Sequence, residues 1–403
     1  MMNRYEMKTV NQKTKRMLWL CYLFFGIIGF VLGMRTSIFY YVQEAYLDSY
    51  STIANMILVS GICMQISLFL AGIFIQKLGY KRILNIGLSA FTLSILLMYL
   101  VNGFMDFAIV YTLLMFSYGI AVIILNLYVS ILVPERKSNN LMMLHLFFCI
   151  GALIGPKWIS FFYNNGISWQ WVTALTGIPL LIIVAITLGT KEFAGNQKEK
   201  EVESIEIPMK NSKVLIALFI IVFMCSQIWE YGIGTWFIIF ASKSKGIGSG
   251  ESSSLLTLFY AMYPLVRIVL FKVIHKFDLH NLLIGAFLYS AALATIGAVT
   301  GMPLFYSLTG AGVAVMYPAL MAFMQERLGA NAERKIGFIT MIGGLLQYVA
   351  IWSVGIVSDS YGIGVGFNYM IIYLVVGTIG IIGMKLKSSN SKSRHKKRYG
   401  VVL

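Results

Sequence analysis

The sequence predicts an all-α integral membrane protein with twelve membrane-spanning helices in two six-helix, pseudo-symmetric bundles. Of its 403 residues, 58% are apolar and only 12% are charged, whereas about a quarter of the residues in a soluble domain are charged. The apolar residues form twelve runs, and roughly 20 such residues cross the hydrocarbon core of a bilayer as a helix. The longest hydrophilic interruption divides these runs into six and six.

The runs and their polar breaks give the expected helices in chain order. They are 17–42, 52–75, 82–102, 105–133, 140–164, 168–190, 213–241, 252–274, 281–301, 303–327, 335–357 and 365–385. The segment between the sixth and seventh helices is rich in Lys and Glu, and we interpret it as a linker between two bundles. We therefore divide the chain into an N-terminal bundle (1–190), a cytoplasmic linker (191–212), a C-terminal bundle (213–385) and a basic tail (386–403).

The distribution of Lys and Arg predicts the orientation in the membrane. If the N-terminus is inside, 27 of the 32 basic residues fall in segments on the inner side, and only Lys243 and Lys245 lie in outer loops. Basic residues are enriched on the cytoplasmic side of membrane proteins. We expect a multi-pass protein of the cell (inner or plasma) membrane with both termini cytoplasmic. The basic tail from Lys385 to Arg398 is then expected to anchor on anionic lipid at the membrane surface, and despite the net charge of +16 no nucleic acid is expected as a partner.

A short basic turn joins the second and third helices. Its marked residues are Gly72, Gln76, Lys77, Gly79, Lys81 and Arg82. Their spacing resembles the loop between helices 2 and 3 of the major facilitator superfamily (MFS), which usually has Asp where Gln76 stands. The resemblance implies that the three basic residues pair with neighbouring helix ends and control the inward-facing state. Because Gln76 is uncharged, these pairings are expected to hold the inward-facing state less strongly than in the family. The two glycines are expected to allow close helix packing and a tight turn.

An internal repeat supports the same resemblance, at an offset just under 200 residues. The basic turn recurs in degraded form at Phe271, His275, Lys276, Asp278 and His280; the Glu135-Arg136 end of one helix recurs as Glu326-Arg327; and Gly151-Ala-Leu-Ile154 recurs as Gly343-Gly-Leu-Leu346. Two related halves of six helices are the architecture of MFS transporters. In such folds the substrate binds between the halves, near the middle of the membrane.

Five patches resemble the fucose–galactose–proton symporter group and its sugar-transporting relatives. They begin at Asn126, Leu144, Glu230, Met316 and Gly343. The proton-carrying Asp and Glu of that group fall on Thr36 and Val122 here, so the proton pathway of the group is not reproduced. Asn126 is retained, and it is a candidate to hydrogen-bond a hydroxylated substrate.

Two ionisable residues lie deep in predicted helices, Arg35 in the first and Glu230 in the seventh. Such residues are costly in a bilayer and mark functional sites by default. We expect the two to face the central cavity and to form a pair that opens or shifts during transport. In the alternative, Arg35 extends to the outer headgroups and Glu230 caps a local kink at Gly232.

Four further residues complete the candidate site. Trp236, Tyr317 and Gln347 are expected to flank the cavity, since an aromatic ring beside amide groups suits a sugar. Arg267 resembles an arginine of helix 8 in the superfamily and is assigned to the inner gate. His145, near the inner end of its helix, is either an interfacial histidine or a proton relay.

Together these features predict a secondary transporter working by alternating access on a small polar organic solute, best matched by a sugar or sugar-like compound. The alternative is an efflux antiporter exchanging drugs or amphipathic compounds for protons, since an interior rich in Met and aromatic residues suits promiscuous binding. No metal-ligand cluster, nucleophile–base spacing or phosphate-binding glycine loop is present. We expect no enzyme activity, cofactor or metal; the partners are the solute, the lipid bilayer and, if transport is coupled, protons. A monomer is the default of the superfamily.

Overall fold

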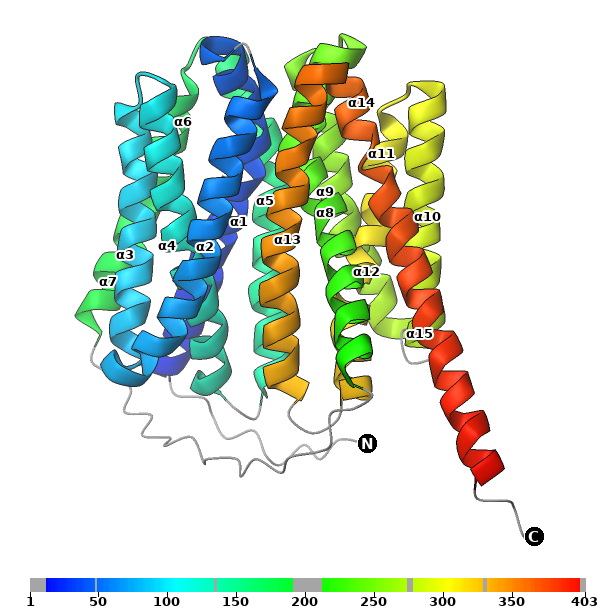
Figure 1. The fold of residues 1–403 in the computed structure, drawn as a ribbon. Coiled ribbons are helices and arrows are strands. Elements are labelled where there is room, and N and C mark those ends of the chain that lie inside the picture. The colour runs from blue at the N-terminus through cyan, green and yellow to red at the C-terminus, as the bar shows by residue number, and fades with distance from the viewer. Residues whose placement is uncertain are drawn as a thin grey trace. The chain divides into compact units, whose positions relative to one another are not determined.

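The computed structural model describes residues 12–47, 49–133, 136–190, 212–273, 278–328 and 332–398. Nearly all of the expected linker lies outside these residues, as do Glu135, His275 and Lys276. The basic tail is described as helical backbone as far as Arg398. Within the described residues every long regular element is an α-helix and there is no β-strand (Figure 1).

The chain divides into two compact units, Met1–Lys200 and Glu201–Leu403. The helices of the N-terminal unit are α1 (Gln12–Tyr46), α2 (Tyr50–Leu78), α3 (Tyr80–Leu97) with the 3₁₀ turn η1 (Met98–Leu100), α4 (Phe104–Leu132), α5 (Lys137–Asn164), α6 (Trp169–Leu175) and α7 (Gly177–Gly189). The helices of the C-terminal unit are α8 (Ser212–Lys245), α9 (Ser249–Val273), α10 (Leu279–Thr300), α11 (Leu304–Leu308), α12 (Gly310–Leu328), α13 (Ala332–Tyr361), α14 (Ile363–Asn368) and α15 (Ile371–Arg398).

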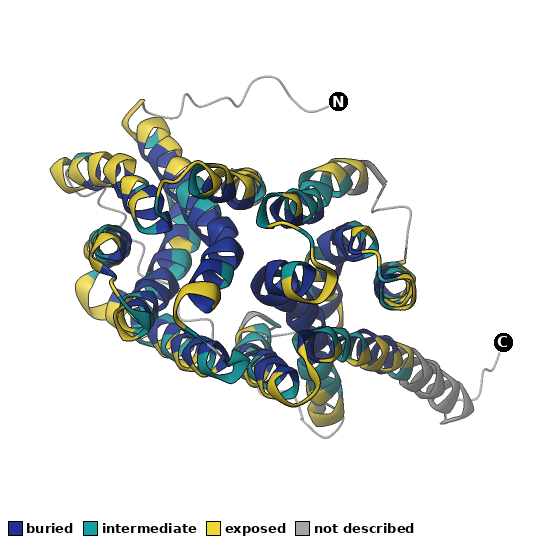
Figure 2. Cartoon of the chain, turned by 90° about the horizontal axis from the view of Figure 1, so that it is seen from above, coloured by how far each residue is buried: buried dark blue, intermediate teal, exposed yellow. Residues whose placement is uncertain are grey.

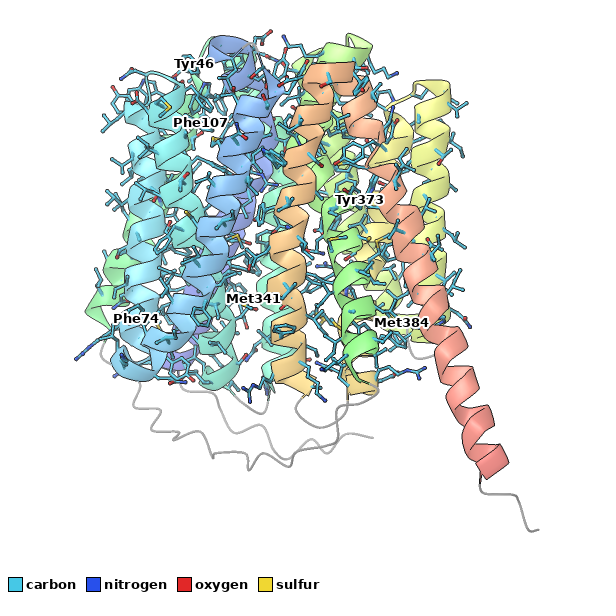
Figure 3. The ribbon with its side chains drawn as sticks, in the orientation of Figure 1. Tyr46, Phe74, Phe107, Met341, Tyr373 and Met384 are labelled. Atoms are coloured by element: carbon cyan, nitrogen blue, oxygen red, sulfur yellow. The ribbon has the colours of Figure 1, made fainter. Side chains whose placement is uncertain are left out.

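These elements form twelve segments long and apolar enough to span a membrane, six in each unit, within the described ranges. Three of the expected helices are each built from a short helix followed by a longer one, namely α6 with α7, α11 with α12, and α14 with α15. The predicted fold class is therefore confirmed. In Figure 3, Tyr46 at the end of α1 and Phe74 near the end of α2 lie toward opposite ends of the N-terminal unit, as consecutive membrane crossings require.

Small residues bring α1 and α5 into backbone contact. A Cβ atom added to Gly151 would overlap the carbonyl oxygen of Gly26, and one added to Gly155 would overlap that of Phe30. Small residues spaced in this way let membrane helices approach closely, where van der Waals packing replaces the hydrophobic effect as the force between helices. As a result most residues of α1 are buried, and the helices of both units carry buried as well as exposed residues (Figure 2).

The C-terminal unit repeats this contact between α8 and α13. A Cβ atom on Gly343 would lie 2.6 Å from the ring of Phe223 and 3.4 Å from the carbonyl oxygen of Ile220. Gly343 is the repeat partner of Gly151, so the sequence repeat corresponds to the same packing relation in both units.

Within the basic turn, only Gly79 separates α2 from α3. Gly79 is both the C-cap of α2 and the N-cap of α3, and its φ of +81° is a conformation that favours glycine. The predicted tight turn is present. The close packing expected at Gly72 is not formed within the N-terminal unit, because a Cβ atom there would meet no heavy atom within 4 Å.

Candidate functional site

Glu230 is a half-buried carboxylate midway along α8. At 1.5 Å per residue it lies about 27 Å along the helix from Ser212 and about 22 Å from Lys245. This depth places a charge in the part of the span where burial is most costly. The residues around Glu230 therefore decide how the charge is tolerated.

Two residues of α9 form the immediate surroundings of this carboxylate. The guanidinium of Arg267 lies over the ring of Tyr263, 5.5 Å from its centroid. Both Glu230 and Arg267 act electrostatically on the Tyr263 hydroxyl. Tyr263 is 5% exposed, and its buried hydroxyl interacts with the Glu230 carboxylate, including by a side-chain hydrogen bond.

Tyr317 of α12 adds a third element to this group. Glu230 and Arg267 also act on its hydroxyl, and its ring packs against Phe223 of α8 with centroids 6.4 Å apart. Unlike Tyr263, it is 40% exposed. We call Glu230, Tyr263, Arg267 and Tyr317 the C-unit polar cluster. Arg267, assigned to the gate from the sequence, lies in this cluster beside the acidic residue.

Arg35 is buried inside the N-terminal unit, with 8% of its surface exposed. Its side chain interacts with Tyr111 of α4, whose ring packs edge-on against Phe39 of α1 at 5.1 Å. The alternative in which Arg35 extends to the headgroups is not what the structure shows, because the charged end is held between α1 and α4. The expected pairing of Arg35 with Glu230 joins residues of different units and stays a prediction.

Asn126 of α4 is occupied by contacts within its own unit. Its side-chain nitrogen donates to the carbonyl oxygen of Val122 (2.7 Å), and its Oδ1 lies 3.2 Å from Nε2 of His145 on α5. Asn126 thus contacts His145, a titratable residue for which the sequence predicted a depth in the membrane but no partner.

Two expected cavity residues are buried in the C-terminal unit. Trp236 is fully buried, and its indole N–H donates to the carbonyl oxygen of Ile351 on α13 (3.3 Å). This contact ties the Trp236 indole to α13 within its own unit, and the expected place of Trp236 beside a cavity stays a prediction. Gln347 of α13 is also buried, so Tyr317 is the one of the three with substantial exposure.

The polar side chains of the basic turn differ in their exposure and contacts. Gln76, Lys77 and Arg82 are exposed. Lys81 is buried, and its Nζ donates to the carbonyl oxygen of Thr190 and, at 2.6 Å, to the hydroxyl of the same residue. A cation at a helix C-terminus satisfies the last carbonyl groups and complements the helix dipole. Lys81 therefore does pair with a helix end, that of α7 in its own unit.

Among the residues that the structure describes, no group of three or more His, Cys, Asp or Glu side chains could hold a metal ion. Sequence reasoning missed Tyr263 and Tyr111 as partners of the two buried charges. The only signal for Tyr263 was its position four residues before Arg267, one helical turn away. No comparable signal linked Tyr111 to Arg35.

Twelve spans with charged and hydroxyl groups enclosed midway along them are features expected of a solute transporter. The family model described as Major Facilitator Superfamily matches residues 18–351. The chain belongs to this family, and it is a transporter and not an enzyme.

Several known proteins are similar to this chain at low sequence identity. Protein TsgA of Salmonella schwarzengrund (strain CVM19633) is 19% identical over 346 residues, which cover 84% of this chain and 88% of that protein. The structure of a D-xylose-proton symporter has a TM-score of 0.74 at 15% identity and covers 92% of this chain and 97% of its own. The MFS transporter FucP in the outward conformation has a TM-score of 0.61 at 19% identity, with coverages of 92% and 99%.

Proposed function

We propose that the protein is a secondary active transporter that moves a small polar organic solute, a sugar or sugar-like compound, by alternating access. The names of two similar structures, a D-xylose-proton symporter and the transporter FucP, support this class of solute. The motif patches beginning at Asn126 and Glu230 support it independently.

The observation that carries the proposal is the C-unit polar cluster. Glu230 acts on the buried hydroxyl of Tyr263 and on the hydroxyl of Tyr317, so a carboxylate and two phenol groups are gathered midway along the spans. A solute hydroxyl would exchange hydrogen bonds with these groups, and the exposed ring of Tyr317 would offer an apolar face. Sugars combine both properties, since hydroxyl groups lie around a C–H face.

The same proposal includes the orientation of the chain in the membrane and the coupling of transport to protons. Both termini are cytoplasmic in this account because of the distribution of basic residues, and the working unit is a monomer in the lipid bilayer. Proton coupling follows if the Glu230 carboxylate changes its charge or its partner during the cycle. Pairing with Arg35 is one such partner change.

The test is uptake into proteoliposomes that contain the purified protein. Labelled D-xylose and L-fucose are compared with a cationic dye, in the wild type and in Glu230→Gln. The matched control is Glu251→Gln, since Glu251 is exposed in the first turn of α9. Sugar uptake lost in Glu230→Gln and kept in Glu251→Gln supports the proposal. Dye export without sugar uptake assigns the protein to the efflux antiporters instead.

A further inference from the structure

Asn126 and His145 form a hydrogen bond whose direction the structure determines. The Asn126 amide nitrogen donates to the Val122 carbonyl oxygen at 2.7 Å. This bond fixes the orientation of the amide, because its oxygen must then be the atom that faces the histidine ring. That oxygen lies 3.2 Å from Nε2 of His145.

An amide oxygen only accepts hydrogen bonds, so Nε2 of His145 must carry the hydrogen atom. In the neutral ring the basic nitrogen is then Nδ1, where a second proton would bind. The ring is also held by Phe25 of α1, which packs edge-on with centroids 5.5 Å apart. Residues of α1, α4 and α5 thus fix both the tautomer and the orientation of one half-buried histidine.

This histidine occupies a distinct position among the titratable groups of its unit. His145 is the only histidine in residues 1–200, and it lies eight residues into α5, about 12 Å along the helix. The acidic residues of the six spans, Glu44 and Asp106, lie two residues from the ends of α1 and α4. Histidine is also the side chain whose ordinary pKa, roughly 6.5, lies in the physiological range.

The helices that pack on α5 within its own unit, α1, α4 and α6, carry few charged residues in their described sequences. The titratable side chains near its contacts are Cys21 and Tyr22 of α1 and Tyr128 of α4, which are ordinarily neutral at pH 7. The sequence of α6 contains no titratable residue. On α1 the nearest charges to Phe25 are Arg16 and Arg35, nine and ten residues away, or about 15 Å.

We propose that His145 is the residue of the N-terminal unit that binds and releases a proton in the transport cycle, and that Asn126 is its positioning residue. This inference rests on the proposed transport function. One proton from water binds Nδ1, the neutral imidazole becomes an imidazolium cation, and the same proton returns to water on release. The Nε2–H bond to Asn126 then becomes charge-assisted and stronger. A cation that appears within the span changes which conformation is favoured, because charge is costly there.

The first test reads the tautomer by NMR of the full-length protein with isotope-labelled histidine in nanodiscs. The His145 signal is assigned by its absence in His145→Gln. We expect the neutral ring to be protonated at Nε2 alone, and to become a mixture of tautomers in Asn126→Leu. A neutral ring protonated at Nδ1 in the wild type would overturn the assignment.

The second test asks whether this proton controls conformation, without any solute. Spin labels at Lys77 and Arg334, one in each unit, report the two main conformations by their distance distribution between pH 5.5 and 8.5. The ratio of charged to neutral histidine changes about tenfold per pH unit, so we expect a several-fold population change centred on the pKa measured for His145 by NMR. The change should vanish in His145→Gln and persist in His395→Gln.

A wild-type population that does not respond to pH, or one that responds equally in His145→Gln, would overturn the proton role. Neither measurement uses a sugar. A protein that fails to bind sugars but shows this pH response would therefore refute the proposed solute class and leave the proton-binding residue in place.

Discussion

The Tyr263 hydroxyl is the residue-scale feature that most directly links packing to transport. It is buried beside Glu230 and Arg267, and it forms a side-chain hydrogen bond with Glu230. Removing a hydrogen bond to a charged group costs about 1.5–3 kcal/mol. We predict that Tyr263→Phe lowers the thermal unfolding midpoint and also weakens solute binding by about tenfold, the equivalent of one lost hydrogen bond.

The matched control is Tyr306→Phe. The Tyr306 hydroxyl donates to Asn368 at 2.5 Å, so its removal should lower stability by about 1 kcal/mol and leave solute affinity unchanged. Differential scanning fluorimetry with and without solute measures both effects. If Tyr263→Phe binds the solute as tightly as Tyr306→Phe does, Tyr263 has no ligand role.

At the scale of elements, Gly151 decides how closely α1 and α5 approach. Because a Cβ there would overlap the Gly26 carbonyl oxygen, Gly151→Val must separate the two helices. Overpacking of this kind costs about 1–3 kcal/mol and occasionally more, which we predict as a clear fall in the unfolding midpoint. Gly72→Ala is the control, since a Cβ at Gly72 meets no atom within 4 Å in its unit. Equal unfolding midpoints in the two variants would contradict the packing account.

The elements themselves could be predicted from the sequence because the bilayer imposes strong constraints. Every backbone polar group in a lipid core must be satisfied within its own segment, so long apolar runs become helices. Those runs locate all twelve spans, and Gly79 marks the turn between α2 and α3. The partners of the polar residues could not be predicted in this way. Whether Trp236 faces a cavity or α13 depends on how α8 is rotated against its neighbours. A helix that is apolar around most of its circumference gives little amphipathic signal for that rotation.

At the scale of the whole molecule, the distribution of basic residues predicts cytoplasmic termini. Cysteine substitutions at Asn102, in the turn between η1 and α4, and at Lys77, at the end of α2, should react differently with a membrane-impermeant maleimide on intact cells. We predict labelling at Asn102→Cys directly and at Lys77→Cys only after permeabilisation. Of the native cysteines Cys21, Cys149 and Cys225 are buried and Cys63 is partly so, which keeps background labelling low. The reverse pattern would invert the orientation.

The central claim is that the C-unit polar cluster binds a hydroxylated solute, and a thermal-shift measurement on purified protein tests it most directly. A ligand at 100 times its Kd stabilises the folded state by about 2.7 kcal/mol. We predict that one or more sugars raise the unfolding midpoint of the wild type and of Glu251→Gln but not of Glu230→Gln. Shifts with cationic dyes alone, or a sugar shift that is equal in Glu230→Gln, would contradict the claim.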